Sequence, residues 1–303
     1  MHLLSEMGLK PDQIKKLIVE TLEPFFENHH ILNGLDVGLL AIEGVNVGMI
    51  STKPNGEKFL NDLLRIYRQA FSADKNRTIE TIFTWEDKIQ ASIQAHWNQG
   101  RFEVDKSHLD LESFRFESFR NIGVVCEACI QPYISQMLAI VDIAKSQSAK
   151  VAQKKSPTFG SQVQQLSLSL SDEEFLAPKP WGLFLNEWRN ISQHHSSKTE
   201  NDSILATYGS SKNPKTLALT REGLMDANRE IHSRLAIIKA ASNIFVLDQY
   251  EECLKLNPQR LNNTIPQSTI FDISSAIATQ GFQVIHYTIS ENEISMTLQE
   301  LQK

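Results

Sequence analysis

Residues 188–195 bring together side chains that could do chemistry on a phosphodiester. Arg189 supplies a guanidinium, Asn190 an amide and His194 an imidazole within a span of six residues. A histidine with a pKa near neutrality can take a proton from a ribose 2′-hydroxyl or give one to the leaving oxygen, and a guanidinium can hold two phosphate oxygens. The chemistry indicated is metal-independent transesterification of RNA, which leaves a 2′,3′-cyclic phosphate and a 5′-hydroxyl.

A helix must position these side chains. One apolar helical face precedes and overlaps the motif, and its members are Trp181, Phe184, Trp188 and Ile191. On an ideal helix Asn190 and His194 are neighbours, so the amide could orient the imidazole. Arg189 and His194 would diverge by about 140°. We therefore expect either that the helix unwinds near Gln193 or that two chains contribute to one cleft.

The segment resembles the Arg-Asn-x-x-x-His motif of HEPN domains, a helical family that includes many metal-independent endoribonucleases. The family pattern also has a long helix upstream, a helix leading into the motif and a long helix after it, and residues 112–254 have this order. Tyr208, Gly209 and residues 217–220 are also similar to what HEPN sequences carry between the motif and the last helix.

The resemblance implies a role for each residue of the motif. His194 would be the general acid/base, Arg189 the phosphate clamp and Asn190 the orienting residue. His195 is a candidate auxiliary residue, and which of the two imidazoles acts stays open. The resemblance also implies RNA as the substrate, a homodimer, no cofactor and no metal. By family analogy the protein would be a regulated toxin or antiviral defence effector with an antitoxin or regulatory protein as a partner.

Three other interpretations remain open. The chain could be a catalytically inactive HEPN-fold module that binds RNA or a protein partner and dimerises. The terminal domains could carry the function while the bundle only dimerises. Arg189 and the histidines could also be a solvated helix terminus, where cations are favoured by the helix dipole.

Composition limits the function classes. The net charge of −6 and pI near 5.9 argue against a broad, non-specific nucleic-acid surface but leave room for a local basic site. No apolar run approaches the roughly 18 residues of a membrane helix. The first six residues lack the basic and apolar stretches of a secretory signal. We expect a cytoplasmic protein with no membrane partner.

Cys126 and Cys129 have the spacing of a zinc or redox pair. A structural zinc site needs four ligands, and the remaining cysteine, Cys253, does not make a second pair. The pair also falls inside a predicted helix, away from the helix N-terminus that would activate a thiol. We therefore expect both side chains to be buried packing residues.

Hydrophobic periodicity predicts helices at 11–30, 59–71, 79–97, 112–144, 159–168 and 221–254, although the alternation at 166–170 fits a strand equally well. Pro132 is expected to kink the long helix, and Thr220 is expected to cap the last one. Residues 35–49 fit either a short hairpin turning near Gly44 or a glycine-weakened helix. Residues 145–157 and 196–215 are predicted to be loops, the second of them mobile.

The chain is predicted to be mainly α with three domains. These are an N-terminal accessory, mostly helical domain (1–105), a HEPN-like antiparallel four-helix bundle (106–256) and a small α+β appendage (257–303). In the appendage, residues 268–280 suggest a helix with Gly281 as its C-cap. Residues 283–288 and 294–298 suggest a hairpin that turns at 291–292.

Overall fold

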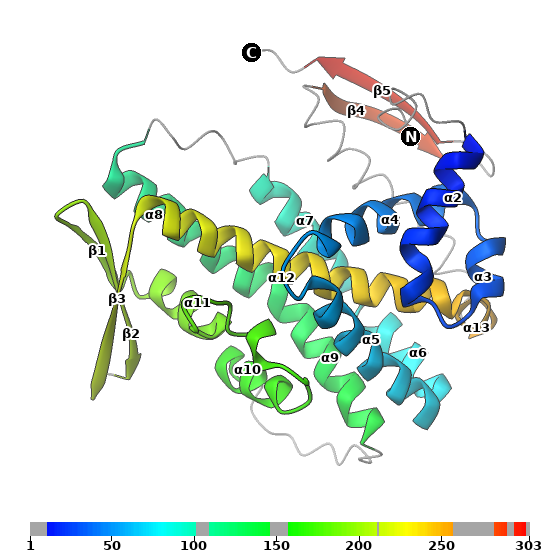
Figure 1. The fold of residues 1–303 in the computed structure, drawn as a ribbon, viewed down its shortest axis with the longest axis horizontal. Coiled ribbons are helices and arrows are strands. Elements are labelled where there is room, and N and C mark those ends of the chain that lie inside the picture. Colours follow the sequence, from blue (N-terminus) through cyan, green and yellow to red (C-terminus); the bar gives the residue numbers. More distant parts are fainter. Residues whose placement is uncertain are drawn as a thin grey trace. The chain divides into compact units, whose positions relative to one another are not determined.

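The computed structural model describes residues 11–100, 109–145, 157–210, 212–256, 282–289 and 294–300. These residues are mainly helical, as predicted, with a small three-stranded sheet and a two-stranded hairpin (Figure 1). Contacts divide the chain into two compact units, Met1–Gly48 with Val246–Lys303, and Met49–Phe245. The predicted domain boundary at 105 lies outside the described residues.

The first described elements of the first unit are short helices. They are α2 (Pro11–Leu22), the 3-10 turn η1 (Glu23–Phe25), α3 (His29–Gly34) and the start of α4 (Val37–Ser51). The helix predicted for 11–30 ends early because Pro24 disfavours the α conformation of the residue before it. Residues 37–51 are helical, which decides between the two structures left open for that stretch.

Asp248 connects the end of α12 (Arg221–Asp248) to the segment between η1 and α3. It is 1% exposed and ends α12, which is followed by α13 (Tyr250–Leu256). Its Oδ1 accepts the backbone N–H groups of Glu27 (3.1 Å) and Asn28 (2.8 Å), and its carbonyl accepts Asn28 Nδ2 (2.8 Å). The helix predicted to continue to 254 is therefore two helices, with the break at Gln249.

The predicted C-terminal hairpin is confirmed. Strands β4 (Phe282–Ile289) and β5 (Ile294–Glu300) pair antiparallel, with Phe282 opposite Glu300 and a register irregularity between Val284 and His286. The helix predicted for 268–280, Gly281 and the turn at 291–292 lie outside the described residues.

The second unit starts with three helices, α5 (Gly56–Ala73), α6 (Lys75–Thr84) and α7 (Glu86–Gly100). The helix predicted at 59–71 is confirmed. The helix predicted at 79–97 is two helices that meet at Trp85. Asp74 begins the first of them, since its side chain accepts the backbone N–H of Arg77 (3.0 Å).

A continuous helical run crosses this unit, consisting of α8 (Leu111–Val124), the π-helical segment η3 (Val125–Ile130) and α9 (Gln131–Ala144). The N–H of Gln131 bonds to the carbonyl of Cys126, five residues back. This wider turn precedes Pro132, whose ring would otherwise crowd the carbonyl four residues before it. The hydroxyl of Ser92 donates to the carbonyl of Cys129 (2.6 Å) and gives it a partner. The predicted disturbance at Pro132 thus takes the form of a π turn.

Among the described helices, the run Leu111–Ala144 alone is long and apolar enough to cross a membrane. In its most apolar 18-residue window, 56% is buried inside the fold.

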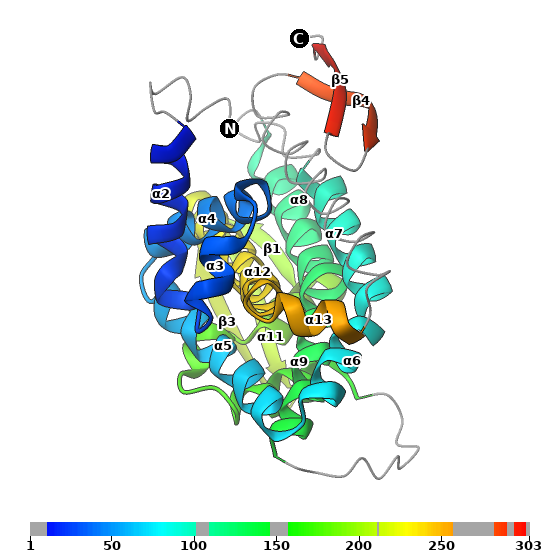
Figure 2. The same ribbon diagram turned by 90° about the vertical axis from the view of Figure 1, so that its right-hand side faces the viewer.

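The long helix α12 fills the core of the second unit. Its predicted apolar face is buried, with Leu224, Ala227, Ile231, Leu235, Ile238, Ala241 and Phe245 all at most 3% exposed. Figure 2 looks approximately along this helix, which lies between α5 and the α8–α9 run. Tyr67 stacks on Phe245 with ring centroids 5.1 Å apart. The predicted cap is confirmed, since Thr220 Oγ1 accepts the N–H of Gly223 (3.0 Å).

Two shorter helices, α10 (Phe159–Ser167) and α11 (Leu185–Gln193), pack against each other, and α11 also packs against α8. A three-stranded antiparallel sheet follows, formed by β1 (Ser197–Glu200), β2 (Ser203–Ser210) and β3 (Asn213–Leu219). The prediction of a mobile loop at 196–215 is therefore wrong. Asn201 and Asp202 make the first turn with φ of 48° and 60°, the conformation of a two-residue type I′ hairpin turn.

Helices α8 and α11 approach each other closely at Gly123. A Cβ built on Gly123 would lie 2.2 Å from Ser192 Oγ and 3.0 Å from Ser192 Cβ. Any larger residue at position 123 must push the helices apart or displace Ser192. This contact therefore sets the distance between the two helices that carry the candidate site.

We expect Gly123→Ala to lower the free energy of unfolding by about 1–3 kcal/mol, because the added methyl group overpacks the contact with Ser192. Combining it with Ser192→Gly removes the clashing atoms, so the double variant should lose less than the sum of the two single variants. Urea unfolding followed by circular dichroism measures all three.

Gly160→Ala is the matched control, since a Cβ there meets nothing closer than 3.4 Å, at Asn186 Nδ2. It should be neutral or slightly stabilising because alanine favours helix. Equal destabilisation by both alanine variants would show that the close approach at position 123 has no special energetic role.

Candidate functional site

Helix α11 is fixed at its apolar face. Trp188 is fully buried and stacks against Phe119 of α8, with ring centroids 6.5 Å apart, and its ring meets Trp181 edge-on at 5.9 Å. At the start of the helix, the carboxylate of Glu187 accepts the backbone N–H of Phe184 (2.9 Å). Of the four apolar residues predicted to share one helical face, Trp188 and Ile191 are buried in α11. The prediction is wrong for Trp181 and Phe184, which precede the first turn of the helix.

The helix ends directly before the histidines. The N–H of Ser196 bonds to the carbonyl of Ile191 (3.0 Å), and the N–H of His195 bonds to that of Ser192 (3.4 Å). This pair of bonds is a Schellman motif, with His194 as the C-cap and His195 at the next position in the left-handed conformation, φ 49°. Of the two arrangements expected from the sequence, unwinding of the helix is the one present within the chain.

The motif residues have different environments. The side chains of Asn190, His194 and His195 are exposed, and that of Arg189 is 25% exposed. The amide oxygen of Asn190 accepts Nη1 of Arg189 (3.3 Å), and the N–H of His194 bonds to the Asn190 carbonyl (3.0 Å). In the part of the chain that the structure describes, no side-chain hydrogen bond joins Asn190 to His194.

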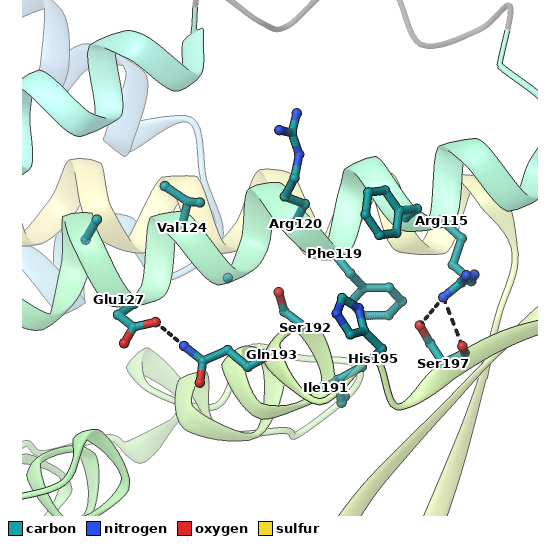
Figure 3. A pocket seen from close by; sticks show the side chains of 13 residues that line it. Arg115, Phe119, Arg120, Val124, Glu127, Ile191, Ser192, Gln193, His195 and Ser197 are labelled. Atoms are coloured by element: carbon teal, nitrogen blue, oxygen red, sulfur yellow. Dashed lines mark hydrogen bonds between the residues drawn. The ribbon is translucent and has the colours of Figure 1, made fainter.

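Glu127, in the π-helical segment η3, completes the polar contacts of the motif. Its Oε1 accepts Nη2 of Arg189 (2.9 Å), and its Oε2 accepts the side-chain amide of Gln193 (Figure 3). Nε of Arg189 is buried and has no hydrogen-bond partner among the described residues. Sequence reasoning missed Glu127 because it lies 62 residues from Arg189 and only the packing of α11 on η3 brings them together. The only feature of the sequence that could have pointed to Glu127 is that it is an acidic residue on a helix expected to pack beside the motif.

A cavity of about 440 Å³ lies beside this ion pair, between α8, η3 and the end of α11. Arg115, Phe116, Arg120, Glu127 and His195 are among the residues that line it (Figure 3). Gln193 and Ser192 line it from α11. Arg189, Asn190 and His194 are not lining residues. Of the motif residues, His195 therefore lines the cavity. Arg189 does not line it, but forms an ion pair with Glu127, which does.

Arg115 closes one end of the cavity by tying α8 to β1. Its Nη1 donates to the carbonyl oxygen (2.9 Å) and to the hydroxyl (2.7 Å) of Ser197. Glu112 pairs with the same guanidinium and accepts the hydroxyl of Thr199 (2.8 Å). The hydrogen bonds from Arg115 and then Thr199 lower the pKa of Glu112. Since this pKa is lower in the folded chain, the contact favours folding at neutral pH and is lost as the pH falls through that value.

The cysteines are packing residues, as expected. Cys126, Cys129 and Cys253 are free and buried. Burial raises the pKa of Cys126, and it raises the pKa of Cys129 and of Cys253 to about 12, so the thiols stay protonated at neutral pH. The described residues contain no group of three or more His, Cys, Asp or Glu side chains that could hold a metal ion.

Comparison with known proteins gives no match to a protein-family model, to a curated protein or to a solved structure. The function of the chain is therefore inferred from its own residues and contacts.

We expect His195→Gly to be more stable than His195→Ala by about 1 kcal/mol, because glycine adopts the left-handed conformation without the steric cost that a Cβ brings. Both variants lack the imidazole, so their difference isolates the backbone term. Urea unfolding of the two proteins measures it. Equal stabilities would contradict the left-handed conformation at position 195.

Proposed function

We propose that the chain is a metal-independent endoribonuclease of HEPN type, which cleaves RNA by 2′-hydroxyl transesterification. The observation that carries the proposal is the end of α11. There, Arg189 lies on the last turns of the helix, and the Schellman motif leaves the imidazoles of His194 and His195 exposed, with His195 lining a cavity. The order of a long helix, a motif helix and a second long helix also supports it.

Each motif residue has a chemical role in this proposal. His194 takes the proton from the 2′-hydroxyl, since a general base must reach its substrate and this ring is exposed. The 2′-oxygen attacks phosphorus, the bond to the 5′-oxygen breaks, and that oxygen takes up the proton that His194 had accepted. Arg189 holds the phosphate as charge accumulates on it, and Asn190 orients the guanidinium through its amide oxygen.

The wider context follows from family analogy alone. We place the protein in the cytoplasm as a homodimer and as a regulated toxin or defence effector, restrained by an antitoxin or another regulatory protein. The pairing of Arg189 with Glu127 agrees with restraint, because it neutralises the phosphate clamp within the single chain.

The same ion pair favours the second candidate function, an inactive HEPN-fold module that binds RNA or a protein partner and dimerises. A permanently paired Arg189 would hold α11 against η3 and take no part in catalysis. The two candidates differ in whether loss of His194 changes RNA cleavage.

We expect the purified protein to cleave structured RNA in EDTA and to leave 2′,3′-cyclic phosphates and 5′-hydroxyls. His194→Ala should reduce the rate by about 10²–10⁴-fold, since it removes the general acid/base. Gel analysis of labelled RNA, with end-group analysis of the products, measures both effects.

His30→Ala is the matched control because His30 is also exposed and lies in the other compact unit. Its rate should equal that of the wild type. If wild type and His194→Ala cleave equally, His194 is not the acid/base. If neither cleaves while both bind RNA, the ribonuclease is rejected and the binding module is favoured.

We expect Glu127→Gln to raise the affinity for RNA by several-fold at low salt, because it removes the carboxylate that competes with phosphate for Arg189. Fluorescence anisotropy with a labelled RNA, in a His194→Ala background that prevents cleavage, measures the affinity.

Asp226→Asn removes the same charge from an exposed ion pair with Arg229 on α12, outside the cavity. This control should change the affinity less than Glu127→Gln. Unchanged or weaker binding by Glu127→Gln would show that Arg189 does not clamp phosphate.

A further inference from the structure

Two aromatic rings from different elements face the same cavity. Phe116 of α8 is 46% exposed, and His195 is exposed at the end of α11. Their rings are nearly parallel, with an interplanar angle of 9°, and their centroids are 6.1 Å apart. Offset aromatic pairs have ring centroids about 4.5–7 Å apart, so these two rings overlap only in part and some of each ring face stays uncovered by the other. Both rings line the cavity and offer stacking surface to a flat ligand.

The backbone holds His195 in place despite its exposure. The left-handed conformation at φ 49° is uncommon for a residue other than glycine. The hydrogen bonds of the helix cap maintain it, and the carbonyl of Ser196 accepts the N–H of Thr207 from the sheet (2.7 Å). The contact between Gly123 and Ser192 fixes the distance to α8. A strained and exposed residue held on a rigid frame is typical of a binding site.

The neighbouring polar groups suit a nucleotide. Arg120 lies four residues after Phe116, so the two are neighbours on one helical face. Its side chain is 56% exposed and pairs only one turn back, with Glu117, an ion pair of low strength. Its guanidinium points away from Ser192 and His195 (Figure 3), so a phosphate bound there would lie at the rim of the cavity while a base lies inside. Ser192 and Gln193 line the cavity and could bond to the base edge.

We propose that this cavity binds one unpaired nucleotide of single-stranded RNA, an inference that rests on the ribonuclease function proposed above. The base stacks on Phe116 and His195, and Arg120 holds its phosphate. Bases in a duplex are already stacked and paired, whereas an unpaired base can turn out onto aromatic side chains. A volume of about 440 Å³ is within the usual range for small-ligand sites. His195 is then a binding residue and His194 the acid/base, which assigns different roles to the two adjacent imidazoles.

The test uses the full chain with His194→Ala, so that RNA is bound without being cleaved. The probe is a short single-stranded RNA that carries a fluorescein label for anisotropy, or 2-aminopurine, whose fluorescence falls when it stacks. Phe116→Leu and His195→Ala should each weaken binding by about tenfold and reduce the quenching, since each removes one stacking surface. Phe116→Trp should bind at least as well as the parent. Arg120→Ala should lower the slope of log affinity against log salt by about one.

Two matched controls lie outside the cavity. Leu168→Ala alters another exposed apolar side chain, at 83% exposure, and Arg229→Ala removes an arginine that also pairs one turn back, with Asp226. Leu168→Ala should leave the RNA affinity and the 2-aminopurine quenching unchanged, and Arg229→Ala should leave the salt slope unchanged. Thermal unfolding of every variant identifies any loss that comes from misfolding.

The inference and the ribonuclease can fail separately. If the wild type cleaves RNA but Phe116→Leu and His195→Ala bind as tightly as their parent, the nucleotide cavity is overturned and the ribonuclease stands. If nothing is cleaved but quenching depends on Phe116 and His195, the cavity stands and the enzyme is rejected. His195→Phe gives a further test, because it should keep stacking and cleavage if His195 only binds, and should abolish cleavage if His195 is the acid/base. Absence of RNA binding overturns the cavity.

Discussion

The close approach of α8 and α11 at Gly123 is the constraint on which the rest of the site depends. Because position 123 has no Cβ, Ser192 can pack directly onto the backbone of α8. With the helices at this distance, Glu127 reaches Arg189 on one side of the contact and Phe116 faces His195 on the other. A shift of about 1 Å between the helices would alter both contacts together, since both span the same interface.

The end of α11 is the second determinant. Arg189 and His194 would point in different directions on a continuous helix. The Schellman motif ends the helix at Gln193, so the histidines are placed by cap geometry rather than by helical spacing. Glycine is the usual residue at the left-handed position of this motif. A histidine there keeps the cap hydrogen bonds and adds an exposed ring. The left-handed conformation lowers the stability of the folded chain relative to glycine, but the ring provides a side chain that can bind a ligand.

Much of the helical fold could be predicted from the sequence, because burial follows the 3.6-residue period. The apolar face of α12, its cap at Thr220 and the long run through Pro132 were predicted on that basis. The three-stranded sheet was missed, since only Ile204, Ala206 and Leu219 are buried among its strands and the apolar alternation is weak. The pair Asn201–Asp202 carried the available signal, because these residues tolerate the left-handed conformation of a two-residue hairpin turn.

The candidate site shows the same division between local and tertiary information. The segment containing Arg189, Asn190 and His194 was recognised because it is contiguous. Glu127 and Phe116 were not, because their partners are far away in sequence and spacing alone cannot state which helix packs on which. The sequence did raise the possibility that the helix unwinds near Gln193, since that conclusion needs only the geometry of one helix.

Charge pairing bears on how an acidic chain could bind RNA. Each arginine near the cavity has a carboxylate partner, and the pairs are Arg115–Glu112, Arg120–Glu117 and Arg189–Glu127. Exposed ion pairs contribute about 0–1 kcal/mol, whereas a guanidinium that holds phosphate through two hydrogen bonds gains more. A phosphate can therefore replace a carboxylate at the exposed Arg120 at little cost. Arg115 is only 11% exposed and is bound to β1, so it stays structural. The net charge of −6 disfavours non-specific association with nucleic acid. RNA binding would therefore depend on a site where bases can stack on aromatic rings and where an arginine, such as Arg120, can exchange its carboxylate partner for a phosphate.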